Sequence, residues 1–147
     1  MFGKRTLVFF LLCGAGILAF SSFARSAPTP EIKIIPNKTS FRKGELVHLE
    51  FYLVGTFSLF SEPVTIPSLN HQVTIVGPTG VVYTKREFIH RAEPVTLRRG
   101  SEMKLGELDW NLLDLSGKPM PKGVYKIVVS LSDYQLQGEI SIEILDT

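Results

Sequence analysis

The sequence predicts an all-β protein, an antiparallel β-sandwich of seven or eight strands that occupies residues 31–147. Three observations indicate this class. From residue 31 onward, apolar and polar residues alternate at every second position, as they do on strands with one buried face. Turn-forming residues interrupt the pattern at intervals of about ten residues, which is typical of a sandwich. No segment after residue 28 has the three- and four-residue spacing of an amphipathic helix.

Four strands are expected in the first half of this region, at residues 31–35, 46–54, 71–76 and 81–85. In the second of them, Val47, Leu49, Phe51 and Leu53 share one face while polar side chains take the other, so this strand is expected to be half-buried. The sequence Gly-Pro-Thr-Gly at residues 77–80 is a turn by composition. It predicts that the third and fourth strands form a hairpin.

Three further strands are expected at residues 103–110, 124–131 and 139–145. The first contains Gly106, which predicts a β-bulge or a close approach of another chain segment. The second directs Tyr125 and three aliphatic side chains to one face. Residues 132–138 connect the second and third strands as a hairpin, and the third strand can already resume at Tyr134.

Residues 1–24 have the composition of a signal peptide. Lys4 and Arg5 precede an apolar stretch, and small residues follow it, so cleavage after Ala24 is expected. The alternative is an uncleaved membrane anchor, because the charge-free stretch approaches the ~20 residues that span a bilayer. Both interpretations place the domain outside the cytoplasm, secreted, periplasmic or attached to the envelope, with residues 25–30 as a linker.

The composition excludes several classes of function. Cys13 is the one cysteine of the chain and lies in the leader, so the domain has no disulfide and no thiol chemistry. Without Lys4 and Arg5, 14 basic residues balance 14 acidic residues. A domain with zero net charge has no general electrostatic attraction to nucleic acid or to an anionic membrane surface. Membrane contact is expected only through an uncleaved leader.

No pattern of catalytic or metal-binding residues is evident. His48, His71 and His90 are the three histidines, and their spacing does not match that of a zinc or copper site. We therefore expect them to be solvated residues of strands and loops. Nucleophile motifs, paired carboxylates and glycine-rich phosphate loops are also missing. The sequence predicts a non-enzymatic protein without a cofactor or a metal.

The segment that joins the strands at residues 103–110 and 124–131 is a motif of structural residues. It contains Trp110, Asp114, Gly117, Pro121, Gly123 and Tyr125. The tryptophan is expected to seal one end of the core, and the tyrosine to point inward or toward the corner of the sandwich. The proline keeps this crossing out of a central strand, because it cannot donate a ladder hydrogen bond.

This motif, a tryptophan followed by D-x-x-G and then P-x-G-x-Y, resembles the closing part of the intracellular proteinase inhibitor family, the BsuPI-type domain. It is also similar to the Ig-like module of flagellar hook-capping proteins. The stretch SFRKGELVHLEFYLV resembles the opening strand of these domains, and with VTIVGPTGVVY it is similar to macroglobulin-type modules. The resemblance spans most of residues 34–131. It implies an Ig-like sandwich that binds another protein, with a protease or an envelope component as the candidate partner.

Residues 55–63 form the loop in which a binding surface is expected. Three large apolar residues lie there, at what should be one end of the sandwich, where loops carry function. The residues expected to contact a partner are Phe57, Leu59, Phe60, Arg98 and Arg99. There are two alternatives to a binding role for these residues. The apolar residues can cap the core instead, and the domain can be a structural or spacer subunit of a cell-envelope assembly.

Overall fold

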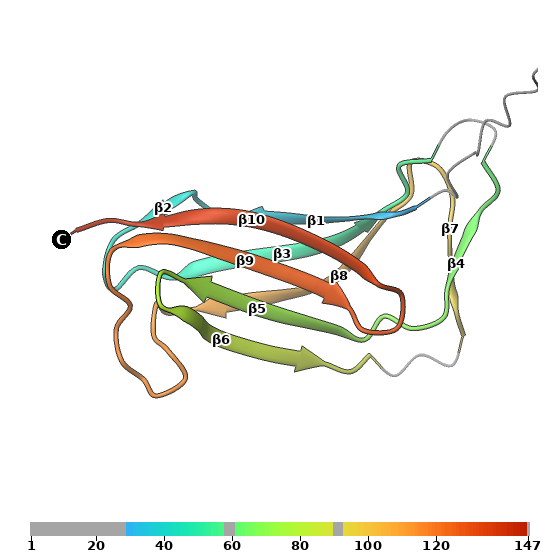
Figure 1. Ribbon diagram of the computed structural model, residues 1–147. Coiled ribbons are helices and arrows are strands. Elements are labelled where there is room, and N and C mark those ends of the chain that lie inside the picture. Colours follow the sequence, from blue (N-terminus) through green and yellow to red (C-terminus); the bar gives the residue numbers. More distant parts are fainter. Residues whose placement is uncertain (1–28, 58–60, 90–92, 147) are drawn as a thin grey trace, which may run out of the picture.

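The computed structural model describes residues 29–57, 61–89 and 93–146. The predicted signal peptide, Leu59, Phe60 and His90 lie outside these residues. The described chain contains strands and turns without a helix, and its two main sheets face each other as a sandwich (Figure 1). A helix long and apolar enough to cross a membrane is therefore not found within these ranges.

Ten strands make up the described part of the fold. They are β1 (Glu31–Pro36), β2 (Ser40–Phe41), β3 (Val47–Val54), β4 (Val64–Ile66), β5 (His71–Gly77), β6 (Gly80–Glu87), β7 (Val95–Leu97), β8 (Glu102–Trp110), β9 (Gly123–Leu131) and β10 (Leu136–Ile144). One main sheet has the order β1-β3-β8, and the other has the order β2-β10-β9-β5-β6. Neighbours are antiparallel except β2 and β10, which run parallel.

The predicted sandwich is confirmed, with two corrections. Seven strands have six residues or more, and they match the seven predicted runs. The other three, β2, β4 and β7, have only two or three residues, too few to show a period of two in the sequence. In addition, β10 begins at Leu136, between the two expected starts at Tyr134 and residue 139, because it pairs with β9 along its whole length.

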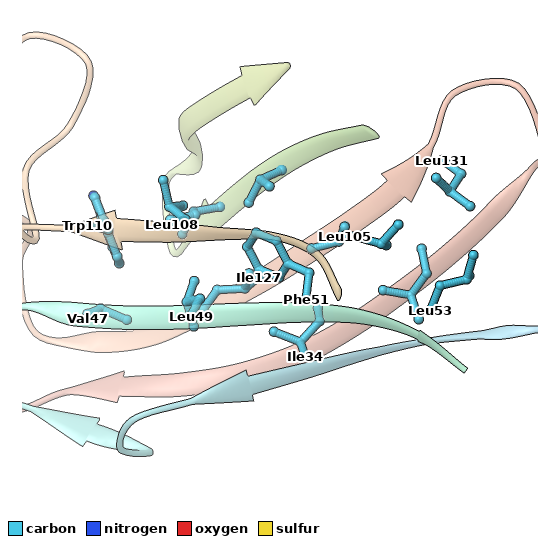
Figure 2. Close-up of a cluster of buried hydrophobic side chains, with 14 of the residues drawn as sticks. Ile34, Val47, Leu49, Phe51, Leu53, Leu105, Leu108, Trp110, Ile127 and Leu131 are labelled. Carbon is cyan, nitrogen blue, oxygen red and sulfur yellow. The ribbon is translucent and has the colours of Figure 1, made fainter. Parts of the chain in front are cut away.

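The alternation seen in the sequence builds the core. Val47, Leu49, Phe51 and Leu53 of β3 are all buried and face the second sheet (Figure 2). On β9, Tyr125 and the three aliphatic residues at every second position after it are buried too. Burial of a large apolar side chain contributes about 1.5–3 kcal/mol, so this core is the main source of stability in a domain without disulfides.

Gly106 lies at an irregularity in the ladder between β3 and β8, as predicted. Phe51 pairs with Gly106, whereas the next residue, Tyr52, pairs with Lys104, so Leu105 is the extra residue of the bulge. A Cβ on Gly106 would lie 3.3 Å from Nε2 of His71. His71 is buried rather than solvated, and its Nδ1 hydrogen-bonds with the carbonyl oxygen of Leu69 at 3.0 Å. The glycine thus makes room for the imidazole between the two sheets.

Candidate functional site

The structure corrects the predicted role of Phe57. Its side chain is only 6% exposed and belongs to the hydrophobic core. A buried side chain cannot anchor a partner unless it leaves the core, so the capping alternative is the right one for this residue. Leu59 and Phe60 lie outside the described residues.

Arg98 and Arg99 lie at the same end of the sandwich as the beginning of the 55–63 loop. The amide of Gly55 donates to the carbonyl oxygen of Ser101 at 2.9 Å, and the amide of Gly100 donates to Gly55 at 2.8 Å. A Cβ at Gly55 would collide with the main chain at Arg98. Both arginines are exposed beside this junction. The structure therefore brings together the loop start and the two basic residues, but without an apolar anchor among the described residues.

The opposite end is built by the Trp110–Tyr125 motif. The rings of Trp110 and Tyr125 pack with centroids 5.9 Å apart, and both side chains are almost completely buried. The indole Nε1 donates to the carbonyl oxygen of Leu113 at 2.7 Å, and the Tyr125 hydroxyl donates to that of Pro121 at 2.7 Å. In this last contact the hydroxyl bonds back to the main chain four residues earlier in the chain. Tryptophan and tyrosine thus hold both ends of the 111–122 loop against the core.

Within this loop, Asp114 organises a tight turn. Its Oδ1 accepts hydrogen bonds from the amide and hydroxyl of Ser116, at 2.8 and 2.6 Å, and from the amide of Lys118 at 2.9 Å. These bonds, that of the Ser116 hydroxyl first, lower the pKa of the Asp114 carboxyl. Gly117 follows at φ 81°, a conformation that glycine adopts without strain. Asp114 and Gly117 thus shape the turn within this loop.

A groove of about 450 Å³ lies between this loop and the start of β6. Both the 111–122 loop and the turn between β5 and β6 are at the same end of the sandwich (Figure 1). Its apolar lining includes Val81 and Leu115, which are 63% and 67% exposed, and the half-buried Met120. Sequence reasoning missed this groove because its two walls lie more than 30 residues apart. The available signal was Leu115, an apolar residue inside a polar turn.

The outer face of β3 and β8 carries a compact set of charged residues. His48 pairs across the strands with Asp109, at 2.6 Å between Nδ1 and Oδ1, and this contact raises the pKa of the imidazole. Glu50 and Glu107 lie directly opposite each other, and Nζ of Lys104 is 2.8 and 2.7 Å from their oxygens.

These residues include the arrangement closest to a metal site in the described chain. Ligand atoms of His48, Glu50 and Glu107 lie within 4.8 Å of one another. Lys104, however, already places its ammonium between the two carboxylates. The arrangement forms an ion-pair network across the sheet, which offsets the repulsion of two acids in opposite positions.

No protein-family model matches the sequence, and no curated protein matches it. Solved structures that match the chain include the alkylpurine DNA glycosylase AlkC of Pseudomonas fluorescens, at 18% identity and a TM-score of 0.48, over 80% of this chain and 30% of that one. A CARDB domain from Pyrococcus furiosus has 12% identity and a TM-score of 0.44, over 81% and 90% of the two chains. A β-glucosidase of Listeria innocua has 14% identity and a TM-score of 0.42, over 78% and 16%. The chain thus spans a small part of both enzymes.

The groove is lined by both apolar and polar side chains. The one carboxylate that lines it, that of Asp114, uses Oδ1 for three hydrogen bonds inside its own turn. The rest of the lining combines three aliphatic residues, a methionine and two prolines with the polar residues Thr79, Ser116 and Lys118. Such a surface gains free energy when another apolar group covers it.

Proposed function

We propose that this protein is an exported, non-enzymatic module that binds another protein at the groove between β6 and the 111–122 loop. One observation carries the proposal. Val81 and Leu115 expose about two-thirds of their side chains on the same concave surface. Apolar side chains that border a groove are typical anchors of protein interfaces, because a partner can bury them in a defined pocket.

The resemblance to BsuPI-type domains supports this function, since the same motif that resembles that family forms the loop wall of the groove. It also suggests a protease as one class of partner. The predicted leader supports export.

The proposed surface replaces the predicted one. The notion of an apolar anchor at residue 57 fails because Phe57 is buried. Arg98 and Arg99 are exposed at the other end of the sandwich, where β4 and β7 lie (Figure 1). The groove and the two arginines therefore lie at opposite ends of the sandwich.

Site-specific photo-crosslinking in the producing cell tests the binding function. A photoreactive residue at position 115 should give a heteromeric adduct of defined mass, and Leu115→Asp should abolish capture by a neighbouring probe at position 81. Leu46 is the matched control, because it is 51% exposed but lies outside the groove. Adducts at position 46 alone would contradict the proposal. An adduct of twice the chain mass would instead support a structural subunit.

Export is tested separately by N-terminal sequencing of the protein recovered outside the cytoplasm. Cleavage after Ala24 should give a chain that begins with Arg25. An intact leader in the membrane fraction would favour the anchor, and recovery in the cytoplasm would contradict export in either form.

A further inference from the structure

Strand β6 is the outermost strand of the five-stranded sheet. It pairs with β5 on one side, and no described strand pairs with its other edge. An edge strand presents a row of main-chain donors and acceptors that another extended chain can use. The groove borders the first residues of this same strand, Val81 and Val82.

The hydrogen-bond pattern identifies which main-chain groups of β6 face the free edge. The amide of Ser132 donates to the carbonyl oxygen of Asn70 at 3.0 Å. The N–H and C=O groups of Asn70 therefore point toward β9. The main-chain N–H and C=O groups of successive residues point alternately to the two neighbouring strands. Those of His71 and Val73 therefore point toward β6. Their partners there are Glu87 and Lys85.

The residues between these partners, Thr84 and Arg86, therefore direct their N–H and C=O groups away from β5, to the open edge. Thr84 and the side chain of Arg86 are exposed. A bulge interrupts the strand earlier, where Ile75 pairs with Tyr83 but Val76 pairs with Val81. The bulge takes up one extra residue of β6, and beyond it the regular alternation continues from Thr84 toward Phe88, which is 67% exposed.

The charges on β6 indicate what kind of segment fits. Lys85 is paired with Glu87 at 2.5 Å, whereas Arg86 donates from Nε to the neutral Gln72 at 2.8 Å. Among the described residues, no carboxylate is paired with the Arg86 guanidinium. An acidic residue opposite Arg86 would be stabilising, since opposite charges in facing positions attract. A second copy of this chain, paired antiparallel about Arg86, would place two arginines opposite each other and repel.

We infer that the partner supplies an extended segment that pairs with the free edge of β6, with an acidic residue facing Arg86 and an apolar residue in the groove beside Val81. This inference rests on the proposed function and names the form of the ligand. The spacing follows from β5, which pairs Val76 with Val81 and Gln72 with Arg86. A strand on the other side of β6 in the same register has its apolar and acidic residues four positions apart. Main-chain pairing of this kind supplies affinity, and the two side chains supply specificity.

A phage-displayed library of random ten-residue peptides, selected on the purified protein, tests the inference. Enriched sequences should have an apolar and an acidic residue four positions apart. Hydrogen exchange should then report the contact. The Thr84 and Arg86 amides should exchange at least 10-fold more slowly with peptide bound. The Lys85 amide, already bonded to β5, is the control within the same strand and should change little.

Two variants separate strand pairing from binding in the groove. Thr84→Pro removes an N–H from the free edge, a position where an edge strand tolerates proline, and should reduce peptide affinity at least 10-fold with little loss of thermal stability. Arg86→Glu should reduce it similarly and select basic peptides instead.

The failures of the two proposals are distinguishable. Peptides that bind in a Leu115-dependent way but leave the Thr84 and Arg86 amides unprotected would overturn strand pairing and leave the groove as the binding site. A library without binders of the expected pattern would also overturn the inference. A dimer in sedimentation that Thr84→Pro dissociates would show that a second copy, not a partner, occupies the edge.

Discussion

The hydroxyl of Tyr125 donates a hydrogen bond to the carbonyl oxygen of Pro121, four residues earlier, at 2.7 Å. Burial of the phenol raises its pKa, so the group stays neutral and keeps its proton for this bond. Tyr125→Phe keeps the packed ring and removes only the donor. We expect a loss of ~1 kcal/mol in the free energy of unfolding, measured by urea denaturation. Tyr134→Phe, on a half-buried tyrosine in the β9–β10 turn, should be nearly neutral.

Gly77 is the residue that gives the Tyr125 ring its space. A Cβ at position 77 would lie 2.6 Å from Cε1 of this ring, closer than any real contact. Because the ring is fully buried, Gly77→Ala should destabilise the protein by about 1–3 kcal/mol. A double-mutant cycle with Tyr125→Leu, a smaller side chain, should recover a part of this loss. Strict additivity of the two substitutions would contradict a direct clash.

A substitution at Phe57 distinguishes a core residue from a residue of a binding surface. Phe57→Ala should lower the free energy of unfolding by about 3 kcal/mol, because it leaves a cavity in the core. Phe88→Ala is the matched control, since Phe88 is 67% exposed, and should change stability by less than about 0.5 kcal/mol. Unchanged stability of the Phe57 variant would restore the interpretation of this residue as an anchor.

The pair of His48 and Asp109 makes stability depend on pH in a defined direction. The Asp109 carboxylate raises the pKa of His48 above 6.5, so the folded state favours the protonated imidazole. The contribution to stability is complete below pH 6.5 and is lost as the pH rises through the raised pKa. An NMR titration of His48 should show a lower pKa in Asp109→Asn. Asp133→Asn, in the β9–β10 turn, should leave it unchanged.

The long strands were predictable because each carries its own signal. In β3, four apolar residues at every second position are enough to show which face is buried, and in β5 and β6 the Gly-Pro-Thr-Gly turn shows that two strands are neighbours. Both signals are local. The short ladder of β4 with β7 was missed, because three residues show no period and the pairing of Thr65 with Thr96 is distant in sequence.

The candidate site was less predictable, because it depends on where segments meet in space. The apolar residues at 57–60 appeared to be one group, yet the structure places Phe57 in the core. Conversely, Val81 and Leu115 are unremarkable in the sequence and share a surface only after the sandwich forms. The motif around Trp110 was predicted to be structural, and the same loop also supplies a wall of the groove.

The parallel pairing of β2 with the end of β10 has a consequence for biogenesis. Phe41 lies beside Ile144, so about 100 residues must be synthesised before these two positions can meet. A chain that emerges from the ribosome with its N-terminus first cannot close the five-stranded sheet until the last strand is free, and contacts of such long range make folding slow. During its synthesis the polypeptide therefore stays in an open form. Strands that have no pairing partner yet are then exposed to chaperones and to proteolysis.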